Sequence, residues 1–155
     1  MPPLALVIPA YNEERRLGRT LEAVATYLLR NSLVANVIVV DDGSTDGTAD
    51  VAAEYASSNS PVDVISLPRQ QGKGAAVRAG VLAADADVIG FMDADLSTPL
   101  EELPRVLASF DDGYDLAIGS RALTQSQVLR SQPAYRRVGA SIFRWLAPSI
   151  AGLHG

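Results

Sequence analysis

The stretch Val37-Ile-Val-Val-Asp-Asp-Gly-Ser-Thr-Asp46 shows the pattern that decides the fold: a short apolar run, then a turn rich in acids and glycine, then a helical stretch. This pattern recurs along the chain. Five apolar runs are predicted to be strands: 4–8, 37–40, 62–67, 88–92 and 116–118. Five longer stretches are predicted to be helices: 13–29, 46–56, 74–84, 99–110 and 133–146. Strict alternation of the two predicts an α/β fold, a Rossmann-like and mostly parallel sheet with helices on both faces.

Length and composition narrow the class of protein. The chain has 155 residues, 48% of them hydrophobic, which suits one domain with a real core. It has no cysteine and one histidine near its end, which argues against thiol catalysis, cysteine-ligated zinc and a Ser-His-Asp site. No apolar run reaches the roughly 18 residues of a membrane span, and the first residues lack the features of a secretory signal. We therefore expect a cytoplasmic protein, and we expect no nucleic-acid partner.

The net charge of −5 is unevenly distributed. Residues 1–115 carry all 18 acids, whereas residues 116–155 carry five arginines and no acid. Arg136, Arg137 and Arg144 alternate with apolar residues in the last predicted helix. Two interpretations stay open for this segment: a basic amphipathic helix at an anionic membrane surface, or a helix that packs on the sheet with its arginines in solvent.

Acidic residues follow two of the predicted strands, at the sheet edge where α/β proteins bind ligands. Asp41 and Asp42 follow the second strand, and we expect one or both to meet a cation or to accept hydrogen bonds from a nucleobase or ribose. Asp93 and Asp95 follow the fourth strand, where an extended backbone would place both carboxylates on one side. Such a pair suits Mg²⁺ or Mn²⁺, which keeps other positions for water and substrate phosphates.

Neighbouring polar residues have plainer roles. Ser44, Thr45 and Asp46 are predicted to cap or turn the chain into the next helix. Thr98 is predicted to cap the helix 99–110, with Pro99 in its first position.

Cationic groups accompany the acids. Lys73 is the only lysine of the chain and lies between two glycines at a predicted helix start, and Arg121 follows the last predicted strand. Each can face a phosphate; a solvated lysine and a surface ion pair are the alternatives. Neither a glycine-rich dinucleotide turn nor a P-loop is present. Together, these features predict a site for a nucleoside-diphosphate donor.

Four strings strongly resemble family 2 glycosyltransferases of the GT-A fold, in order and spacing over nearly the whole chain. They are Val7-Ile-Pro-Ala-Tyr-Asn-Glu-Glu14, Val39-Val-Asp-Asp-Gly-Ser-Thr-Asp-Gly-Thr48, Gln71-Gly-Lys-Gly-Ala-Ala76 and Phe91-Met-Asp-Ala-Asp-Leu-Ser-Thr-Pro99. Two further strings, Ala117-Ile-Gly-Ser-Arg121 and Tyr135-Arg-Arg-Val-Gly139, resemble the branch that loads sugars onto polyprenyl phosphates, in particular the dolichyl-phosphate glucosyltransferase type.

The resemblance implies a role for each candidate residue. Pro9, Ala10, Tyr11 and Glu13 would line the nucleotide pocket, with Asp42 touching the base or ribose. Asp93-Ala94-Asp95 would be the DxD element, whose two carboxylates carry Mg²⁺ or Mn²⁺ and the donor diphosphate. Lys73 would bind the donor, while Asp95 and Arg121 would take part in catalysis.

The activity implied is metal-dependent, inverting transfer of a sugar, with UDP-glucose favoured as donor, to a polyprenyl or dolichyl phosphate. That acceptor is already an anion and needs no general base. Relatives in this branch continue past the position of Gly155, so residues 1–155 are expected to be the nucleotide-sugar-binding part of a GT-A domain without its acceptor side. A donor-binding fragment, or a transferase acting on a saccharide, remains the alternative.

Three other classes fit less well. A haloacid-type phosphatase has its nucleophilic aspartate after the first strand, not the fourth. A receiver-like, magnesium-binding signalling module would be expected to have a lysine on its fifth strand, whereas the fifth predicted strand of this chain is followed by Arg121. A sugar-nucleotide pyrophosphorylase wants a glycine-rich first turn, which residues 9–14 are not.

Overall fold

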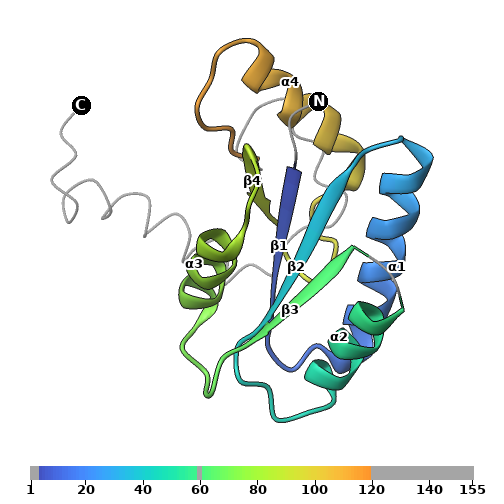
Figure 1. Cartoon of the computed structure of the whole chain (residues 1–155), viewed down its shortest axis with the longest axis vertical. Helices are drawn as coiled ribbons and strands as arrows, with labels where there is room; N and C mark the ends of the chain where they lie inside the picture. The colour runs from blue at the N-terminus through green and yellow to red at the C-terminus, as the bar shows by residue number, and fades with distance from the viewer. Residues whose placement is uncertain (1–3, 59–60, 120–155) are drawn as a thin grey trace, which may run out of the picture. The chain divides into compact units, whose positions relative to one another are not determined.

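The computed structural model describes residues 4–58 and 61–119. It divides into two units, Met1–Ala117 and Ile118–Gly155, and all of the described helices and strands lie in the first. In chain order these are β1 (Leu4–Ala10), α1 (Glu14–Arg30), β2 (Ala35–Asp41), α2 (Thr48–Ser57), β3 (Val62–Ser66), α3 (Lys73–Ala83), β4 (Val88–Phe91), the short 3-10 helix η1 (Leu100–Glu102) and α4 (Leu103–Asp111) (Figure 1).

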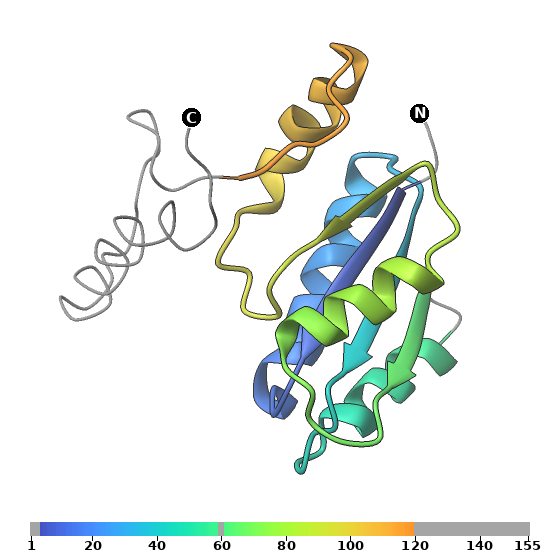
Figure 2. The same cartoon turned by 90° about the vertical axis from the view of Figure 1, so that its left-hand side faces the viewer.

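The four strands form one parallel sheet in the order β3-β2-β1-β4. The chain steps outward from β1 to β2 to β3 and then returns past β1 to β4. Because crossovers between parallel strands are right-handed, this reversal places α1 and α2 on one face of the sheet and α3 on the other (Figures 1 and 2). The predicted α/β fold with helices on both faces is confirmed, and its switch point lies between β1 and β4.

β1 is buried on both faces, as an apolar central strand requires. One face of it, with Leu4, Leu6 and Ile8, packs in the same cluster as the apolar stripe of α1. That stripe consists of Leu17, Leu21, Val24 and Leu28, the spacing of one helix face. The other face, with Ala5 and Val7, packs against small residues of α3 such as Ala76. Both helix layers are therefore anchored on one strand.

Pro9 marks the place where β1 and β4 separate. The β1–β4 pairing runs from Leu4↔Val88 to Val7↔Phe91, and the Met92 N–H then donates to the Val7 carbonyl over 3.0 Å. Strand residues two apart face the same neighbour, so the missing N–H of Pro9 faces the β4 side. Pairing with β2 continues meanwhile to Ala10↔Asp41. The sheet thus opens between β1 and β4 while it stays closed between β1 and β2.

The predicted strand 116–118 is wrong. Residues 116–119 are irregular, and Leu116 and Ile118 are more than 70% exposed. An apolar run becomes a strand only where a neighbouring strand supplies hydrogen-bond partners, and these residues pair with none of the four described strands. The predicted helix 133–146, with its arginines, lies outside the described residues.

The predicted helix start at Pro99 is also wrong. Pro99 is extended, the first helical turn is the 3-10 turn that begins at Leu100, and α4 begins only at Leu103. Pro104 lies in the first turn of α4, where a residue without an N–H costs no hydrogen bond. The second proline therefore marks the start of this helix, and Thr98 does not cap it. Within residues 4–58 and 61–119, the helices are too short or too polar to cross a bilayer.

The α1 stripe supplies a test of the core. Leu21 is 2% exposed and Leu29, on the same helix, is 82% exposed. We expect Leu21→Ala to lower the free energy of unfolding by about 2 to 5 kcal/mol, and Leu29→Ala to change it by less than about 0.5 kcal/mol. Urea unfolding followed by circular dichroism measures both. Equal losses for the two variants would contradict this packing of α1.

Candidate functional site

A pocket of about 330 Å³ lies at the carboxyl ends of β1, β2 and β4, at the switch point of the sheet. It brings together every residue to which the resemblance gives a role except Arg121, which lies outside the described residues. Asp41 is buried outside this lining, where its Oδ1 accepts the Ser44 N–H over 3.2 Å. The lining consists of Pro9, Ala10, Tyr11, Glu13, Asp42, Gln70, Gly72, Lys73, Ala76, Asp93, Ala94 and Asp95. Residues from four separate parts of the sequence thus meet at one opening, as the topology of a parallel sheet dictates.

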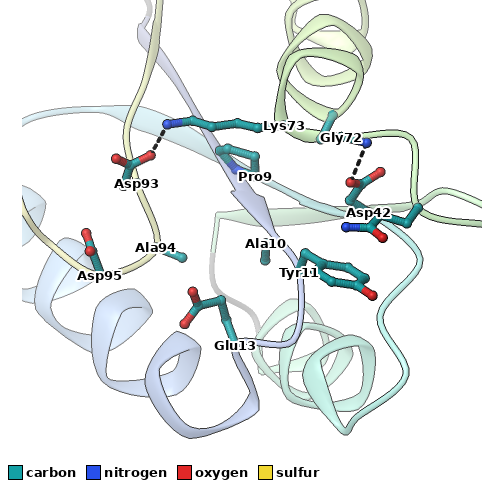
Figure 3. A pocket seen from close by; sticks show the side chains of 12 residues that line it. Pro9, Ala10, Tyr11, Glu13, Asp42, Gly72, Lys73, Asp93, Ala94 and Asp95 are labelled. Atoms are coloured by element: carbon teal, nitrogen blue, oxygen red, sulfur yellow. Dashed lines mark hydrogen bonds and ion pairs between the residues drawn. The ribbon is translucent and has the colours of Figure 1, made fainter. Parts of the chain in front are cut away.

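The pocket has two chemically different ends (Figure 3). At one end lie Asp93, Ala94 and Asp95, and the ammonium of Lys73 reaches over to Asp93. At the other end the ring of Tyr11 lies beside Asp42. Pro9 and Ala10 form the stretch between them, and the side chain of Glu13 points toward the Asp93–Asp95 turn. We call these the carboxylate end and the Tyr11 end.

Asp42 is only 3% exposed, and its charge has partners within the chain. One oxygen accepts the N–H of Gln71 and the other the N–H of Gly72, each over 2.8 Å. Two charge-assisted hydrogen bonds from N–H groups stabilise this buried carboxylate. Asp42 therefore does not need the cation or ligand that we expected from the sequence. The contact of Asp42 with a base or ribose remains a prediction.

Gly43 allows the loop after β2 to lie against the loop after β3. It has a φ of 66°, and a Cβ atom placed on it would come within 2.4 Å of the backbone carbon of Arg69. Gly72 has a φ of 94°, which an L side chain rarely adopts. Both glycines are needed to bring the Gln71 and Gly72 N–H groups to the Asp42 carboxylate.

The loops after β1 and β2 are joined by hydrogen bonds that run in both directions. Asn12 donates its N–H to Ser44 Oγ over 3.0 Å and accepts the Thr45 N–H on Oδ1 over 2.9 Å. The Glu13 N–H donates to Thr48 Oγ1 over 2.8 Å. We call the hydrogen bonds between these two loops the loop clasp; it comprises Asn12, Glu13, Glu14, Ser44, Thr45, Asp46, Gly47 and Thr48. Ser44 therefore binds the neighbouring loop and does not cap α2, whose N-cap is Gly47. Asp46 does both, since it contacts the start of α1 and the Thr48 N–H of α2.

Asp46 serves two helix starts. Its Oδ1 accepts the Thr48 N–H of α2 over 3.0 Å and its Oδ2 accepts the Glu14 N–H of α1 over 3.3 Å. The Thr48 hydroxyl also donates to Asp46. This hydroxyl, together with the two N–H groups, lowers the pKa of Asp46 below its ordinary value and outweighs the opposite effect of desolvation.

The two carboxylates of the DxD element lie in a turn and not, as predicted, on extended backbone. Ala94 and Asp95 form the turn, and Leu96 follows with a φ of 53°. Asp95 Oδ1 accepts the Ser97 N–H over 2.9 Å. Both aspartates nevertheless line the pocket. A turn, and not strand alternation, therefore places both carboxylates at the pocket.

Lys73 is the first residue of α3, and its ammonium pairs with Asp93. The same nitrogen lies 5.8 Å from the centre of the Phe91 ring, within cation–π range. Both partners of the pair are about half exposed. Lys73 is therefore held at the carboxylate end, where an anion could replace Asp93 as its partner.

The described lining of the pocket is strongly acidic. It holds four carboxylates, from Glu13, Asp42, Asp93 and Asp95, and one cationic side chain, that of Lys73. Arg16 lies outside the lining and pairs with Glu13 over 3.4 Å. An anionic ligand at the carboxylate end would be repelled unless a cation entered with it.

Three residues that hold the loops of the pocket were assigned no role from the sequence: Asn12, Glu14 and Thr20. Asn12 and Glu14 belong to the loop clasp, since Glu14 Oε2 accepts the Gly47 N–H over 3.2 Å. The buried Thr20 of α1 donates its hydroxyl to the Ala94 carbonyl over 2.6 Å. The signal for Thr20 was available, because a polar residue on the apolar stripe of a helix needs a hydrogen-bond partner.

A model of the family described as Glycosyl transferase family 2 matches residues 5–154. The chain belongs to this family. It is 35% identical over 140 residues to an undecaprenyl-phosphate 4-deoxy-4-formamido-L-arabinose transferase of Proteus mirabilis, which covers 90% of this chain and 43% of the relative. It is 33% identical over 159 residues to a dolichyl-phosphate beta-glucosyltransferase of Trichomonas vaginalis, which covers 96% and 47%.

The fold agrees with that of a solved GT-A glycosyltransferase. Glucosyl-3-phosphoglycerate synthase of Mycobacterium tuberculosis, solved with Mn²⁺, UDP and glucosyl-3-phosphoglycerate, superimposes with a TM-score of 0.56 at 28% identity, over 70% of this chain and 39% of that one. The predicted GT-A fold is confirmed. This family 2 chain spans less than half the length of each of these relatives.

The loop clasp gives a pH-dependent test. Because folding lowers the pKa of Asp46, its carboxylate adds stability above the ordinary pKa of 3.8, and this contribution fades as the pH falls below that value. We expect Asp46→Asn to destabilise the protein at neutral pH, with a smaller difference from wild type near pH 3. Urea unfolding at both pH values measures it. The control Asp50→Asn removes a carboxylate from the exposed side of α2 and should show a smaller difference at neutral pH. An Asp46→Asn difference that is independent of pH would contradict the assignment.

Proposed function

We propose that this chain forms the donor-binding part of a glycosyltransferase that moves a sugar to a polyprenyl or dolichyl phosphate. The donor that we propose is UDP-glucose. The observation that carries the proposal is the pocket at the switch point, which has two carboxylates of one turn at one end and an aromatic ring with a buried carboxylate at the other. A nucleoside diphosphate has the matching order of groups, a flat base at one end and a charged diphosphate at the other.

The relatives support the choice of substrates. Both named sequence relatives act, by name, on polyprenyl-type phosphates, and the Trichomonas protein is named a glucosyltransferase. The Mycobacterium synthase was solved with UDP and Mn²⁺. A polyprenyl phosphate resides in a membrane, so the proposal also places the protein at a membrane surface, on the cytoplasmic side expected from the sequence.

The carboxylate end suits Mg²⁺ or Mn²⁺ held by Asp93 and Asp95. Among the described residues no group of three or more His, Cys, Asp or Glu side chains is arranged to hold a metal. Two carboxylates fit a hard cation that fills its remaining positions with water and substrate phosphate. Such an ion would neutralise the charge that develops on the departing diphosphate.

The chain's own residues would bind and orient the donor. Tyr11 offers a ring face to the base, and the oxygens of Asp42 keep lone pairs for a donor N–H or hydroxyl beyond those that Gln71 and Gly72 use. Lys73 would turn from Asp93 to the diphosphate, whose charge is greater. The N-terminus of α3, where Lys73 lies, favours the same anion.

The transfer itself needs little from this pocket beyond positioning. An oxygen of the acceptor phosphate attacks the anomeric carbon from the face opposite the nucleotide, the bond from that carbon to the diphosphate oxygen breaks, and the nucleoside diphosphate leaves with the electron pair. The acceptor oxygen is already deprotonated, so no side chain has to remove a proton. Arg121 is proposed to lie near the acceptor phosphate.

The first test is metal-dependent donor binding. We expect UDP and UDP-glucose to bind in calorimetry only with Mn²⁺ or Mg²⁺, and Asp95→Ala to weaken UDP binding with Mn²⁺ by roughly tenfold or more, the effect of losing a charged contact. Asp50→Ala, on the exposed side of α2, is the matched control and should bind like wild type. Equal binding without metal, or an unchanged Asp95→Ala variant, would exclude this donor site. GDP-mannose in the same series tests the choice of donor.

Adding polyprenyl phosphate then separates turnover from binding. Lipid-linked glucose would support the full activity for this chain. Donor binding without that product would restrict the proposal to a donor-binding part.

Removing the ammonium of Lys73 is expected to change the affinities for Mn²⁺ and for UDP in opposite directions. Without its ammonium, Asp93 is free and the pocket is more acidic, so Lys73→Met should bind Mn²⁺ alone up to about fivefold more tightly, the size expected for an exposed pair. The same variant should bind UDP with Mn²⁺ more weakly, because the diphosphate loses its cation. Arg78→Met removes one positive charge from the exposed side of α3 and is the control. Effects of the same sign on both ligands would contradict the proposed exchange of partners.

A further inference from the structure

Thr20 and Ala94 form a hydrogen bond between the middle of α1 and the DxD turn. Thr20 is 2% exposed and Ala94 is 5% exposed, and the bond between them measures 2.6 Å. The two residues are 74 positions apart in the sequence. The bond therefore joins an early helix to the turn after β4, the turn that carries Asp93 and Asp95.

The hydroxyl of Thr20 has no general reason to reach this turn. It lies on the apolar stripe of α1 between Leu17 and Leu21, a position where the helix needs no hydroxyl. Threonine within a helix commonly donates to the carbonyl four residues earlier, yet here the hydroxyl donates out of the helix to Ala94. A buried hydroxyl kept at an apolar position indicates that the bond it makes has a purpose beyond packing.

The carbonyl that accepts this bond belongs to Ala94, the residue between the two aspartates. The carbonyl of Ala94 belongs to the planar peptide group that joins Ala94 to Asp95, so holding it restrains ψ of Ala94 and φ of Asp95. The turn has left the sheet, since β4 ends at Phe91, and Leu96 continues it in a left-handed conformation. Its geometry must come from specific contacts of this kind, because no strand ladder supplies it.

We propose that Thr20 is a positioning residue for the divalent cation of this site. By holding the Ala94 carbonyl it keeps Asp93 and Asp95 in the arrangement that binds the metal, without touching the metal or the donor itself. The inference rests on the proposed function, which places a cation on these two carboxylates. Groups that orient metal ligands in this way change metal affinity when they are removed, even though the ligands remain.

The experiment compares Mn²⁺ affinity in variants at position 20. Thr20→Val keeps the shape of the side chain, removes the hydroxyl and leaves the Ala94 carbonyl buried without it. We expect the affinity for Mn²⁺, measured by calorimetry at saturating UDP, to fall by roughly tenfold or more. Thr20→Ser keeps the hydroxyl and loses a methyl group, and we expect it to bind Mn²⁺ like wild type despite its poorer packing.

A variant with a packing defect alone is the matched control. Val24 lies one turn further along the same stripe and is 1% exposed, so Val24→Ala should lower the thermal unfolding midpoint and leave Mn²⁺ affinity unchanged. Wild-type Mn²⁺ affinity in Thr20→Val, or equal weakening in Thr20→Ser or Val24→Ala, would overturn the inference. If wild-type protein binds UDP without Mn²⁺, both the proposed function and this inference are contradicted. If wild-type protein needs Mn²⁺ and only the variants disagree with expectation, this inference alone fails.

Discussion

The candidate site depends on the point at which β1 and β4 stop exchanging hydrogen bonds. As far as the Val7–Phe91 pair the sheet is continuous, and β1 is buried on both faces. Beyond that pair Pro9 offers no N–H toward β4, so the two segments separate and a pocket forms between them. Because parallel strands need long crossovers, the loops after β1, β2 and β4 come from distant parts of the sequence and still meet at this gap. Local loss of pairing thus creates a binding surface while the rest of the sheet stays intact.

Short polar side chains hold the loops around this gap in irregular conformations. Asn12, Thr48 and Asp46 satisfy backbone N–H groups between the loops after β1 and β2, and Asp42 does so for the loop before α3. These N–H groups belong to no strand ladder, and buried ones need such partners. Loops ordered before a ligand arrives lose little conformational entropy on binding. The polar residues of the motifs therefore have structural roles of their own, separate from any contact with a donor.

Sequence patterns predicted the sheet, its helices and the pocket lining well, because buried parallel strands are short apolar runs and their loops carry the functional groups. They failed where the outcome depends on a partner distant in sequence. Residues 116–118 have the composition of a strand and no described neighbour to pair with. The buried carboxylate of Asp42 clearly needed hydrogen-bond donors, but the sequence could not reveal that a loop thirty residues away supplies them. A polar residue such as Thr20 on an apolar stripe indicates that a hydrogen-bond partner exists, but not that the partner is the Ala94 carbonyl, 74 residues away.

α1 connects the loop clasp with the turn that carries Asp93 and Asp95. It begins at the loop clasp, where the Glu13 N–H meets Thr48, and seven residues later Thr20 holds the turn that carries Asp93 and Asp95. With a rise of 1.5 Å per residue, that interval corresponds to about 10 Å of helix. A helix is stiff, so the spacing along α1 between these two contacts is set by a count of residues and not by the flexibility of loops. α1 therefore acts as a rigid spacer between two loops that lie far apart in the sequence.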